Sequence, residues 1–257
     1  FKALPESDIF DLEYWDLEQA KLFKNKSSLD FDGEVVLITG AASGIGKECV
    51  NSFLRRGSAV IGLDINPSIK TISNNKNFLG LICDLTNEDS IEESIETGVC
   101  YFGGLDMLVL NAGIFPEAQK VSKLSLKQWN KVFSINLDAN LNLLREVYPL
   151  LKIAPNNGRV VIIGSKNISA PGPGAAAYSA SKAALNQLMR VLSMEWAEDN
   201  IRLNALHPNA VFDTGIWTTE VLESRAKQYN LSVNDYKKNN LLNVEINSKD
   251  VSELAAV

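Results

Sequence analysis

A tyrosine and a lysine four residues apart, Tyr178 and Lys182, form the pair whose types and spacing could do chemistry. In a helix, side chains at positions i and i+4 project from the same face. A lysine ammonium beside a phenol favours the phenolate and lowers a phenol pKa that starts near about 10. The tyrosine could then exchange protons near neutral pH. By spacing alone such a pair is more often a solvated helix face, so a catalytic interpretation needs support from other motifs.

A glycine-rich segment, Thr39-Gly-Ala-Ala-Ser-Gly-Ile-Gly46, lies between an expected strand and an expected helix. Gly40 permits a tight turn, Gly44 lets the backbone approach a pyrophosphate, and Gly46 allows the helix to pack closely on the strand. The N-terminus of that helix then faces the negative phosphates. A glycine-rich turn alone is often only structural, but its position between strand and helix favours a dinucleotide site.

Two aspartates follow the next two expected strands. Asp64 ends the second strand, where an acidic group can accept hydrogen bonds from the adenosine ribose diol of a bound dinucleotide. A carboxylate there also repels a 2′-phosphate, which favours NAD over NADP; the alternative is that Asp64 caps the next turn. Asp84 ends the third expected strand and either contacts the adenine or starts the following helix with Thr86 and Asn87.

The composition excludes several other kinds of site. With one histidine, His207, the chain cannot form a zinc site that needs two imidazoles. Its three cysteines, Cys49, Cys83 and Cys100, are too widely spaced for a Cys-x-x-Cys metal site, and we expect no metal. The 25 basic and 31 acidic residues give a net charge of −6. That balance disfavours nucleic acid and anionic membranes as partners.

The elements that must position these residues alternate between short apolar segments and longer helical patterns, which is typical of βαβ units. We expect strands at residues 34–40, 59–65, 78–84, 105–112, 159–165 and 201–207. Helices are expected at 46–56, 89–101, 126–133 continuing toward 151, and 178–198. Because the strands are apolar on both faces, helices must cover both faces. The sequence therefore predicts one α/β domain over residues 33–257, a doubly wound parallel Rossmann sheet with a lid-like excursion at 212–247.

Together these motifs resemble the short-chain dehydrogenase/reductase family. The resemblance covers residues 33–208 and adds Asn111-Ala-Gly113 after the fourth strand and Tyr178-Ser-Ala-Ser-Lys182 at the start of a long helix. It implies an NAD-dependent oxidoreductase that interconverts a hydroxyl and a carbonyl group by hydride transfer. The cofactor-binding residues that it implies are Gly40, Ser43, Gly44, Ile45, Gly46, Asp64, Asp84, Leu85, Asn111, Ala112, Gly113, Tyr178, Lys182, Pro208 and Val211.

The same resemblance implies four catalytic residues. Tyr178 would take the proton of the substrate hydroxyl, and Lys182 would also hold the nicotinamide ribose. Ser165 would stabilise the developing oxyanion. Asn136 matches the asparagine that joins the lysine to a chain of water molecules.

The loop after the sixth strand departs from the family pattern and points to a narrower resemblance. Asn209 replaces the usual glycine and Thr214 comes one residue late, so family contacts with the nicotinamide do not transfer directly. The segments Pro208-Asn-Ala-Val and Asn239-Asn-Leu-Leu242 resemble the dehydrogenase half of bifunctional rhamnulose-1-phosphate aldolase/short-chain dehydrogenase proteins. This implies a small aldehyde or sugar-derived substrate such as lactaldehyde. The alternatives are a polyol or polyol-phosphate dehydrogenase and a non-catalytic NAD-binding sensor or scaffold.

The ends of the chain lead to expectations about the whole protein. The chain opens without methionine, and residues 1–32 resemble the linker of those bifunctional proteins, which implies a fused aldolase domain outside this chain. It stops inside an apparent helix, so we expect the final strand of the family's sheet to be missing. We find no membrane span or signal peptide and expect a cytoplasmic location. The family also implies a homo-oligomer that acts on a small molecule.

Overall fold

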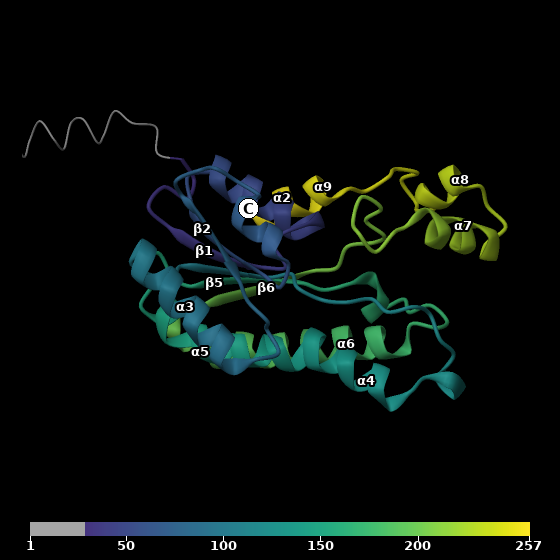
Figure 1. Ribbon diagram of the computed structural model, residues 1–257, viewed down its shortest axis with the longest axis horizontal. Helices are drawn as coiled ribbons and strands as arrows, with labels where there is room; N and C mark the ends of the chain where they lie inside the picture. Colours follow the sequence, from purple (N-terminus) through teal and green to yellow (C-terminus); the bar gives the residue numbers. More distant parts are fainter. Residues whose placement is uncertain (1–28) are drawn as a thin grey trace, which may run out of the picture.

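The computed structural model describes residues 29–257, in which six parallel strands form one sheet in the order β3-β2-β1-β4-β5-β6 (Figure 1). The expected linker at 1–32 lies almost entirely outside the described residues. The strands are β1 Val35–Thr39, β2 Ala59–Asp64, β3 Phe78–Ile82, β4 Met107–Leu110, β5 Arg159–Ile163 and β6 Arg202–Leu206. Each lies within its predicted range, so the predicted Rossmann sheet is confirmed. Each strand is shorter than its predicted range. Two of these differences involve predicted site residues: β3 ends at Ile82 and β5 at Ile163, so Asp84 and Ser165 lie in the loops beyond their strands.

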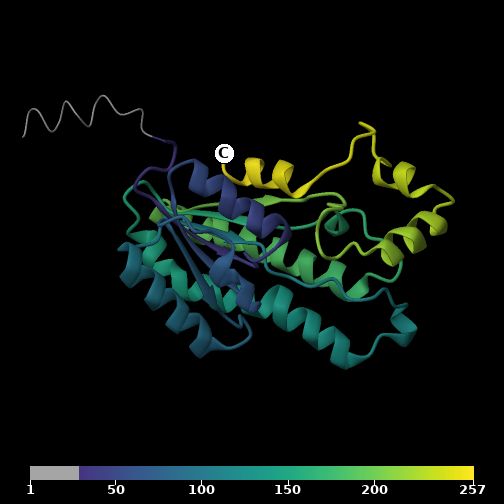
Figure 2. The same ribbon diagram turned by 45° about the horizontal axis from the view of Figure 1, so that its top comes forward.

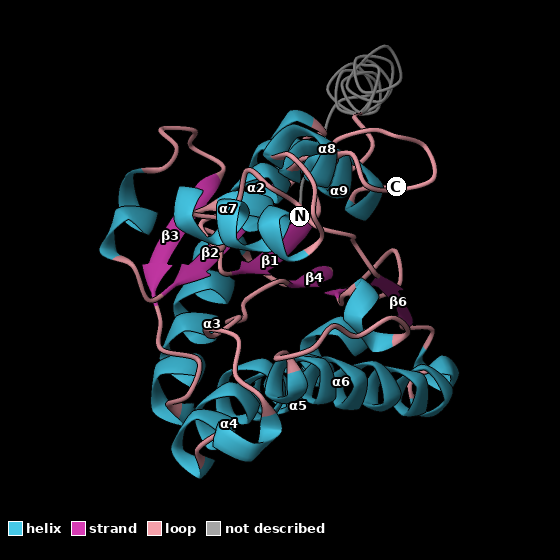
Figure 3. Cartoon of the chain, turned by 90° about the vertical axis from the view of Figure 1, so that its right-hand side faces the viewer, coloured by secondary structure: helices cyan, strands magenta, loops and turns pink. Residues whose placement is uncertain are grey.

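Helices cover both faces of the sheet, as the two-sided apolar strands require. Figures 1 and 3 show α2 and α9 on one face and α3, α4, α5 and α6 on the other. These helices are α2 Gly44–Arg55, α3 Glu88–Phe102, α4 Leu126–Phe133, α5 Ala139–Lys152, α6 Ala176–Glu195 and α9 Ser248–Ala255. Short 3₁₀ turns occupy Pro67–Thr71, Val121–Lys123, Lys166–Ile168 and Ala197–Asp199. None of the helices within residues 29–257 is long and apolar enough to cross a membrane.

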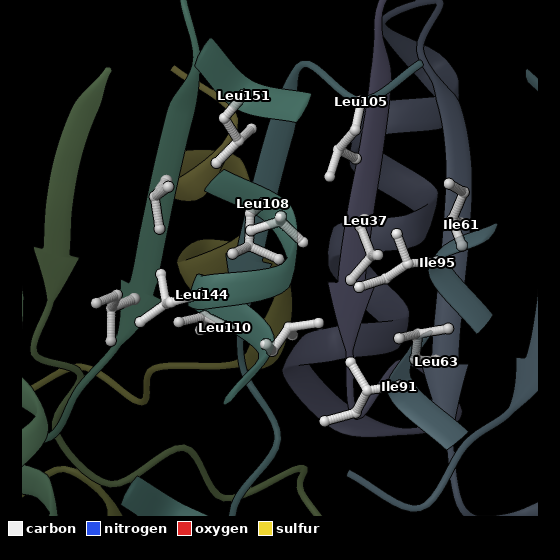
Figure 4. Close-up of a cluster of buried hydrophobic side chains, with 14 of the residues drawn as sticks. Leu37, Ile61, Leu63, Ile91, Ile95, Leu105, Leu108, Leu110, Leu144 and Leu151 are labelled. Atoms are coloured by element: carbon white, nitrogen blue, oxygen red, sulfur yellow. The ribbon is translucent and has the colours of Figure 1, made fainter. Parts of the chain in front are cut away.

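Two apolar cores hold the layers together, one on each face of the sheet. The larger core joins Leu37 and Leu108 of the central strands to Ile91 of α3 and Leu144 of α5 (Figure 4). The second joins the opposite faces of these strands to α2 and α9. The central strands β1 and β4 are buried along their whole length. They therefore give the loops at their carboxyl ends a rigid base.

The helical segment expected from residue 126 toward residue 151 is interrupted. A π turn, Ser134–Asp138, separates α4 from α5. In this turn the backbone N–H of Ala139 bonds to the carbonyl of Ser134, one residue further back than in an α-helix. The turn places Asn136 inside the protein, where its side chain is fully buried.

The polar excursion predicted at 212–247 contains two short helices, α7 Thr219–Gln228 and α8 Val233–Lys237. After it the chain returns to the sheet, so that α9 lies beside α2 (Figure 2). Asp213 anchors the start of α9 by accepting hydrogen bonds from the backbone N–H (2.9 Å) and hydroxyl (2.9 Å) of Ser248. Glu253 of α9 forms ion pairs with Arg55 and Arg56. The excursion is thus held at both of its ends.

Candidate active site

A cavity of about 900 Å³ lies at the carboxyl ends of the strands. Residues that follow each of the six strands line it, and Arg225 of α7 and Tyr236 of α8 line it from the excursion. In the strand order of this sheet, β1 and β4 are neighbours whose connections run in opposite directions. Such a switch point is where open α/β sheets bind their ligands.

The glycine turn leads from β1 into α2 at one wall of the cavity. Gly40 and Gly44 have φ angles of 63° and 53°, in the left-handed region that favours glycine. A Cβ on Gly46 would lie 2.1 Å from the Gly40 carbonyl oxygen, so a side chain there would push α2 off the strand. Gly46 is buried and does not line the cavity, so its predicted cofactor contact stays a prediction. It shapes the turn because it allows this close packing.

Asn111 braces the loops after β1 and β4 against each other. Its Nδ2 donates to the carbonyl oxygens of Thr39 at 3.0 Å and Gly40 at 3.2 Å. In return, the Thr39 hydroxyl accepts hydrogen bonds of 3.0 Å from the backbone N–H groups of Asn111 and Ala112. Ala112 and Gly113 therefore line the cavity from a loop that is fixed to the glycine turn.

Asp64 lines the cavity at the end of β2. Its carboxylate accepts hydrogen bonds from the backbone N–H groups of Ala42 at 2.9 Å and Asn66 at 2.8 Å. The turn-capping alternative is therefore present in the structure. A carboxylate offers about four acceptor sites, so these two bonds leave acceptors for a ribose diol.

Asp84 also lines the cavity, from the loop after β3. Its Oδ1 accepts hydrogen bonds from the backbone N–H (2.9 Å) and hydroxyl (2.7 Å) of Thr86, which lower the pKa of the carboxyl group. The N-cap of α3 is Asn87, which accepts from the backbone N–H of Ser90. Asp84 thus orders the turn before α3 and stays at the cavity surface beside Leu85.

Tyr178 lies at the start of α6 and faces the cavity beside Ser165, which follows β5. A hydrogen bond from the Ser165 side chain lowers the pKa of the phenol, but burial has the larger effect, so the pKa lies above its usual value. The Phe115 ring packs edge-on against the Tyr178 ring, with centroids 4.6 Å apart. These contacts fix the phenol at the cavity wall.

Lys182 lies one turn further along α6 and is 4% exposed. Its Nζ donates to the carbonyl oxygen of Ile163 at 2.8 Å, and burial lowers its pKa to about 8. The predicted lowering of the Tyr178 pKa is not observed overall, because burial of the phenol outweighs the hydrogen bond from Ser165. The effect of the Lys182 ammonium on the phenol stays a prediction. Both side chains nevertheless face the same cavity, as their i, i+4 spacing predicts.

Asn136 lies behind the cavity wall and does not line the cavity itself. Its amide pairs with both backbone groups of Ile114, accepting from N–H at 2.8 Å and donating to the carbonyl at 3.0 Å. It also donates to the Ser181 hydroxyl at 3.1 Å. A Cβ on Gly113 would lie 3.2 Å from its Oδ1 and 3.5 Å from the Lys182 Nζ, so both polar groups border Gly113.

The loop after β6 brings Pro208 and Val211 to the cavity, as predicted. Thr214 also lines the cavity, and its Cγ2 would be 3.2 Å from a Cβ on Gly44. Its hydroxyl donates to the Val211 carbonyl at 2.9 Å. Thr214 is therefore next to the glycine turn although its place in the sequence is shifted by one residue.

Of the predicted site residues, all except Gly46 and Asn136 line the cavity. Sequence reasoning missed further lining residues that share no motif with them: Phe115, Lys131, Lys166, Ile216 and Tyr236. The position of Phe115 directly after the Asn-Ala-Gly-Ile segment was the available signal for the first. For Lys166 the available signal was its position directly after Ser165. Nothing in the local sequence marks Lys131, Ile216 and Tyr236, because the fold of α4 and of the excursion brings them to the cavity. Among residues 29–257 no group of three or more His, Cys, Asp or Glu side chains could hold a metal ion.

Comparison with known proteins assigns this fold and site to a class. The sequence profile described as short chain dehydrogenase matches residues 34–225, so the chain belongs to the short-chain dehydrogenase family. It is 31% identical over 269 aligned residues to YuxG of Bacillus subtilis (strain 168), an uncharacterized oxidoreductase. That alignment covers 100% of this chain and 39% of YuxG, so the chain spans about two fifths of the length of this relative.

Two solved structures share the fold. An NAD⁺-bound xylitol dehydrogenase is 24% identical, with a TM-score of 0.81 over 88% of this chain and 92% of that one. A 3-ketoacyl-(acyl-carrier-protein) reductase from Brucella melitensis complexed with NADH is 23% identical, with a TM-score of 0.77 over 88% and 90% of the two chains. The doubly wound domain of the family is therefore present here.

Proposed function

We propose that the chain is an NAD-dependent oxidoreductase that interconverts a hydroxyl and a carbonyl group. One observation carries the proposal: Tyr178, Ser165 and Lys182 line the same cavity as the glycine turn and Asp64. A sensor that only bound a dinucleotide would need the turn but not a serine, a tyrosine and a lysine at the other end. The geometry therefore favours catalysis over a binding function.

The residues of one half of the cavity fit NAD. Gly40 and Gly44, whose positive φ angles favour glycine, have no side chain to cover the backbone at the N-terminus of α2. A pyrophosphate would be stabilised there by backbone N–H groups and the helix dipole. Asp64 offers remaining acceptors for a ribose diol and would repel a 2′-phosphate. When bound, NAD supplies the acceptor for the hydride. Leu85, Ala112 and the residues around them would form the walls of the adenosine site.

In the proposed mechanism, residues of this chain accept a proton, supply a positive charge and orient the bound cofactor. Tyr178 takes the proton of the substrate hydroxyl as the carbonyl forms, and Ser165 donates a hydrogen bond to the same substrate oxygen. Lys182 places a positive charge behind the phenol and holds the ribose beside the reacting carbon. Because burial raises the pKa of Tyr178, the phenol needs this nearby charge and the Ser165 hydrogen bond to give up its own proton. Asn136 keeps the loop of Ile114 in place beside Lys182.

For the substrate we propose a small aldehyde or sugar-derived molecule such as lactaldehyde, as the resemblance to the bifunctional aldolase/dehydrogenase proteins implies. The aldehyde hydrate would present a hydroxyl to Tyr178. In this reading the chain works beside a fused aldolase domain, which is compatible with its share of the length of YuxG. We propose a homo-oligomer, which size-exclusion chromatography of the purified chain would test.

A second substrate class, polyol phosphates, is favoured by the charges of the cavity. Asp64 and Asp84 lie at the β2 and β3 end, whereas Lys166 after β5 and Arg225 of α7 line the other end, with Lys131 of α4 also at the wall. No Asp or Glu lines the β5 and β6 end among the described residues. Basic groups at the substrate end would attract an anionic group of the substrate.

The experiment that tests the proposal is a substrate panel. The purified chain is incubated with NAD and with lactaldehyde, sugar alcohols or sugar-alcohol phosphates, and NADH absorbance is followed. We expect NADH from at least one group of compounds. Binding of NAD without turnover on any of them would favour the sensor alternative. Faster turnover of the phosphates, lost in a Lys166→Ala variant, would identify the phosphorylated class.

A further inference from the structure

We infer that Asn140 is a positioning residue for the proposed active site, because its side chain holds the π turn that presents Asn136. The inference rests on the proposed function, since the site that Asn140 supports is the one proposed above. Asn140 does not line the cavity, and its side chain bonds to the backbone of Asn136. Its effect would pass through Asn136.

Asn136 connects three parts of the site through its side-chain amide. Two of its hydrogen bonds go to Ile114, in the loop after β4, and the third goes to Ser181 of α6. The Ser181 hydroxyl in turn donates to the carbonyl oxygen of Tyr178 at 2.9 Å. All hydrogen-bonding groups of the amide except one acceptor site are thus used to hold the cavity wall and the helix of Tyr178 together.

The backbone of Asn136 needs support of its own because it lies in the π turn. The i→i−4 ladder is interrupted where the N–H of Ala139 bonds to Ser134. At this point the Nδ2 of Asn140 donates to the carbonyl oxygen of Asn136 at 2.9 Å, in a fully buried contact, and reaches that of Ile135 at 3.5 Å. Asn140 is 3% exposed. Its amide therefore replaces part of the ladder with a side-chain hydrogen bond.

The hydrogen bond between Asn140 and the Asn136 carbonyl is buried, so its loss would disturb the local structure. A buried carbonyl that loses its partner is left without water to replace it, and the local backbone must shift to find another donor. A shift of the π turn would move Asn136, and with it the loop of Ile114 and Gly113 next to the Lys182 ammonium. The expected result is a slower proton-transfer step with little change in the binding of NAD, since the glycine turn and Asp64 lie on other elements.

Three variants separate a positioning role of Asn140 from a general effect on the packing of α5. Asn140→Ala removes the donor. Asn140→Ser keeps one, because a serine hydroxyl in a helix can bond to the carbonyl four residues earlier, which here is that of Asn136. Asn142→Ala is the matched control: Asn142 lies two residues further along α5, is half-buried and has no side-chain hydrogen bond to the described residues.

The experiment measures kcat and KM on the best compound of the substrate panel, the Kd of NAD, and amide hydrogen exchange of the segment that contains Ile114. For Asn140→Ala we expect kcat to fall about tenfold, the Kd of NAD to change less than about twofold, and exchange at Ile114 to quicken about tenfold. We expect Asn140→Ser to recover kcat to within about threefold of the unsubstituted protein, and Asn142→Ala to match that protein.

The outcomes also separate this inference from the proposed function. Unchanged kcat and unchanged exchange in Asn140→Ala would overturn the inference, as would equal losses in Asn140→Ala, Asn140→Ser and Asn142→Ala. If the unsubstituted chain turns over no compound of the panel, the proposed function fails. The exchange rates of Ile114 in the alanine and serine variants then still decide whether Asn140 holds the turn.

Discussion

At the scale of single residues, burial has the largest effect on the pKa values of both Tyr178 and Lys182. The pKa of Tyr178 is raised and that of Lys182 is lowered for the same reason, because burial favours the neutral form of each side chain. Spacing in the sequence correctly placed both side chains at one cavity. It could not predict the degree of burial, which depends on Phe115 and on the end of β5.

The Lys182 pKa leads to a prediction about stability. A lysine whose pKa falls from 10.5 to about 8 binds fewer protons in the folded state, so the buried ammonium costs stability below pH 8, and the cost declines as the pH rises toward 10.5. Lys182→Met is therefore expected to raise the free energy of unfolding by up to about 3 kcal/mol at pH 7. Urea unfolding at pH 7 and pH 9.5 measures this gain, which should shrink by more than half at the higher pH. A gain that does not depend on pH would contradict the assigned cause.

Asp64 leads to a prediction about cofactor choice. Asp64→Asn keeps the shape and an acceptor for one backbone N–H but removes the charge that repels a 2′-phosphate. We expect the affinity for NADP to rise about tenfold and that for NAD to fall severalfold, a change of about 1.4 kcal/mol or more in preference. Titration of both dinucleotides by fluorescence measures it. The comparison variant is Asp84→Asn, because the Asp84 carboxylate already accepts a hydrogen bond from Thr86. An equal change in the preference between NAD and NADP in that variant would argue against a special role of Asp64.

At the scale of elements, the strands were the most predictable part of the fold. Val35–Thr39 and Met107–Leu110 are apolar at nearly every position, and such runs have few alternatives to a central buried strand. The break between α4 and α5 was not predictable, because the apolar pattern continues across it and the π turn depends on the hydrogen bonds of Asn136 with distant residues. Excursion residues such as Tyr236 were missed as part of the cavity for a similar reason: their ring contacts with Phe212 arise only in the folded chain.

The close contact between the glycine turn and α2 leads to a prediction at this scale. A Cβ on Gly46 would meet the backbone oxygen of Gly40 at 2.1 Å, so Gly46→Ala must displace α2 or the turn. We expect a loss of about 2 kcal/mol in the free energy of unfolding and at least a tenfold loss of NAD affinity. Gly104→Ala is the control, since its Cβ would meet nothing within 4 Å. Normal NAD binding by Gly46→Ala would show that NAD binding does not depend on the close packing of the glycine turn.

At the scale of the whole molecule, the fold joins two kinds of surface in one cavity. The β1, β2 and β3 side offers a glycine turn and carboxylates, and the β5, β6 and excursion side offers a serine, a tyrosine and basic side chains. The strand order places these halves on either side of the switch point between β1 and β4. A bound dinucleotide would extend from one half to the other, so its reactive end would lie beside Tyr178.

The most direct test of this account compares hydride transfer by the unsubstituted chain and by Tyr178→Phe, with NADH formation and the Kd of NAD measured on the same preparations. Phenylalanine keeps the ring and its contact with Phe115 but has no hydroxyl. The account predicts a fall in kcat of at least about a thousandfold, at the level of a lost general base, with NAD affinity within about threefold of the unsubstituted chain. Turnover at the unsubstituted rate by Tyr178→Phe would contradict it.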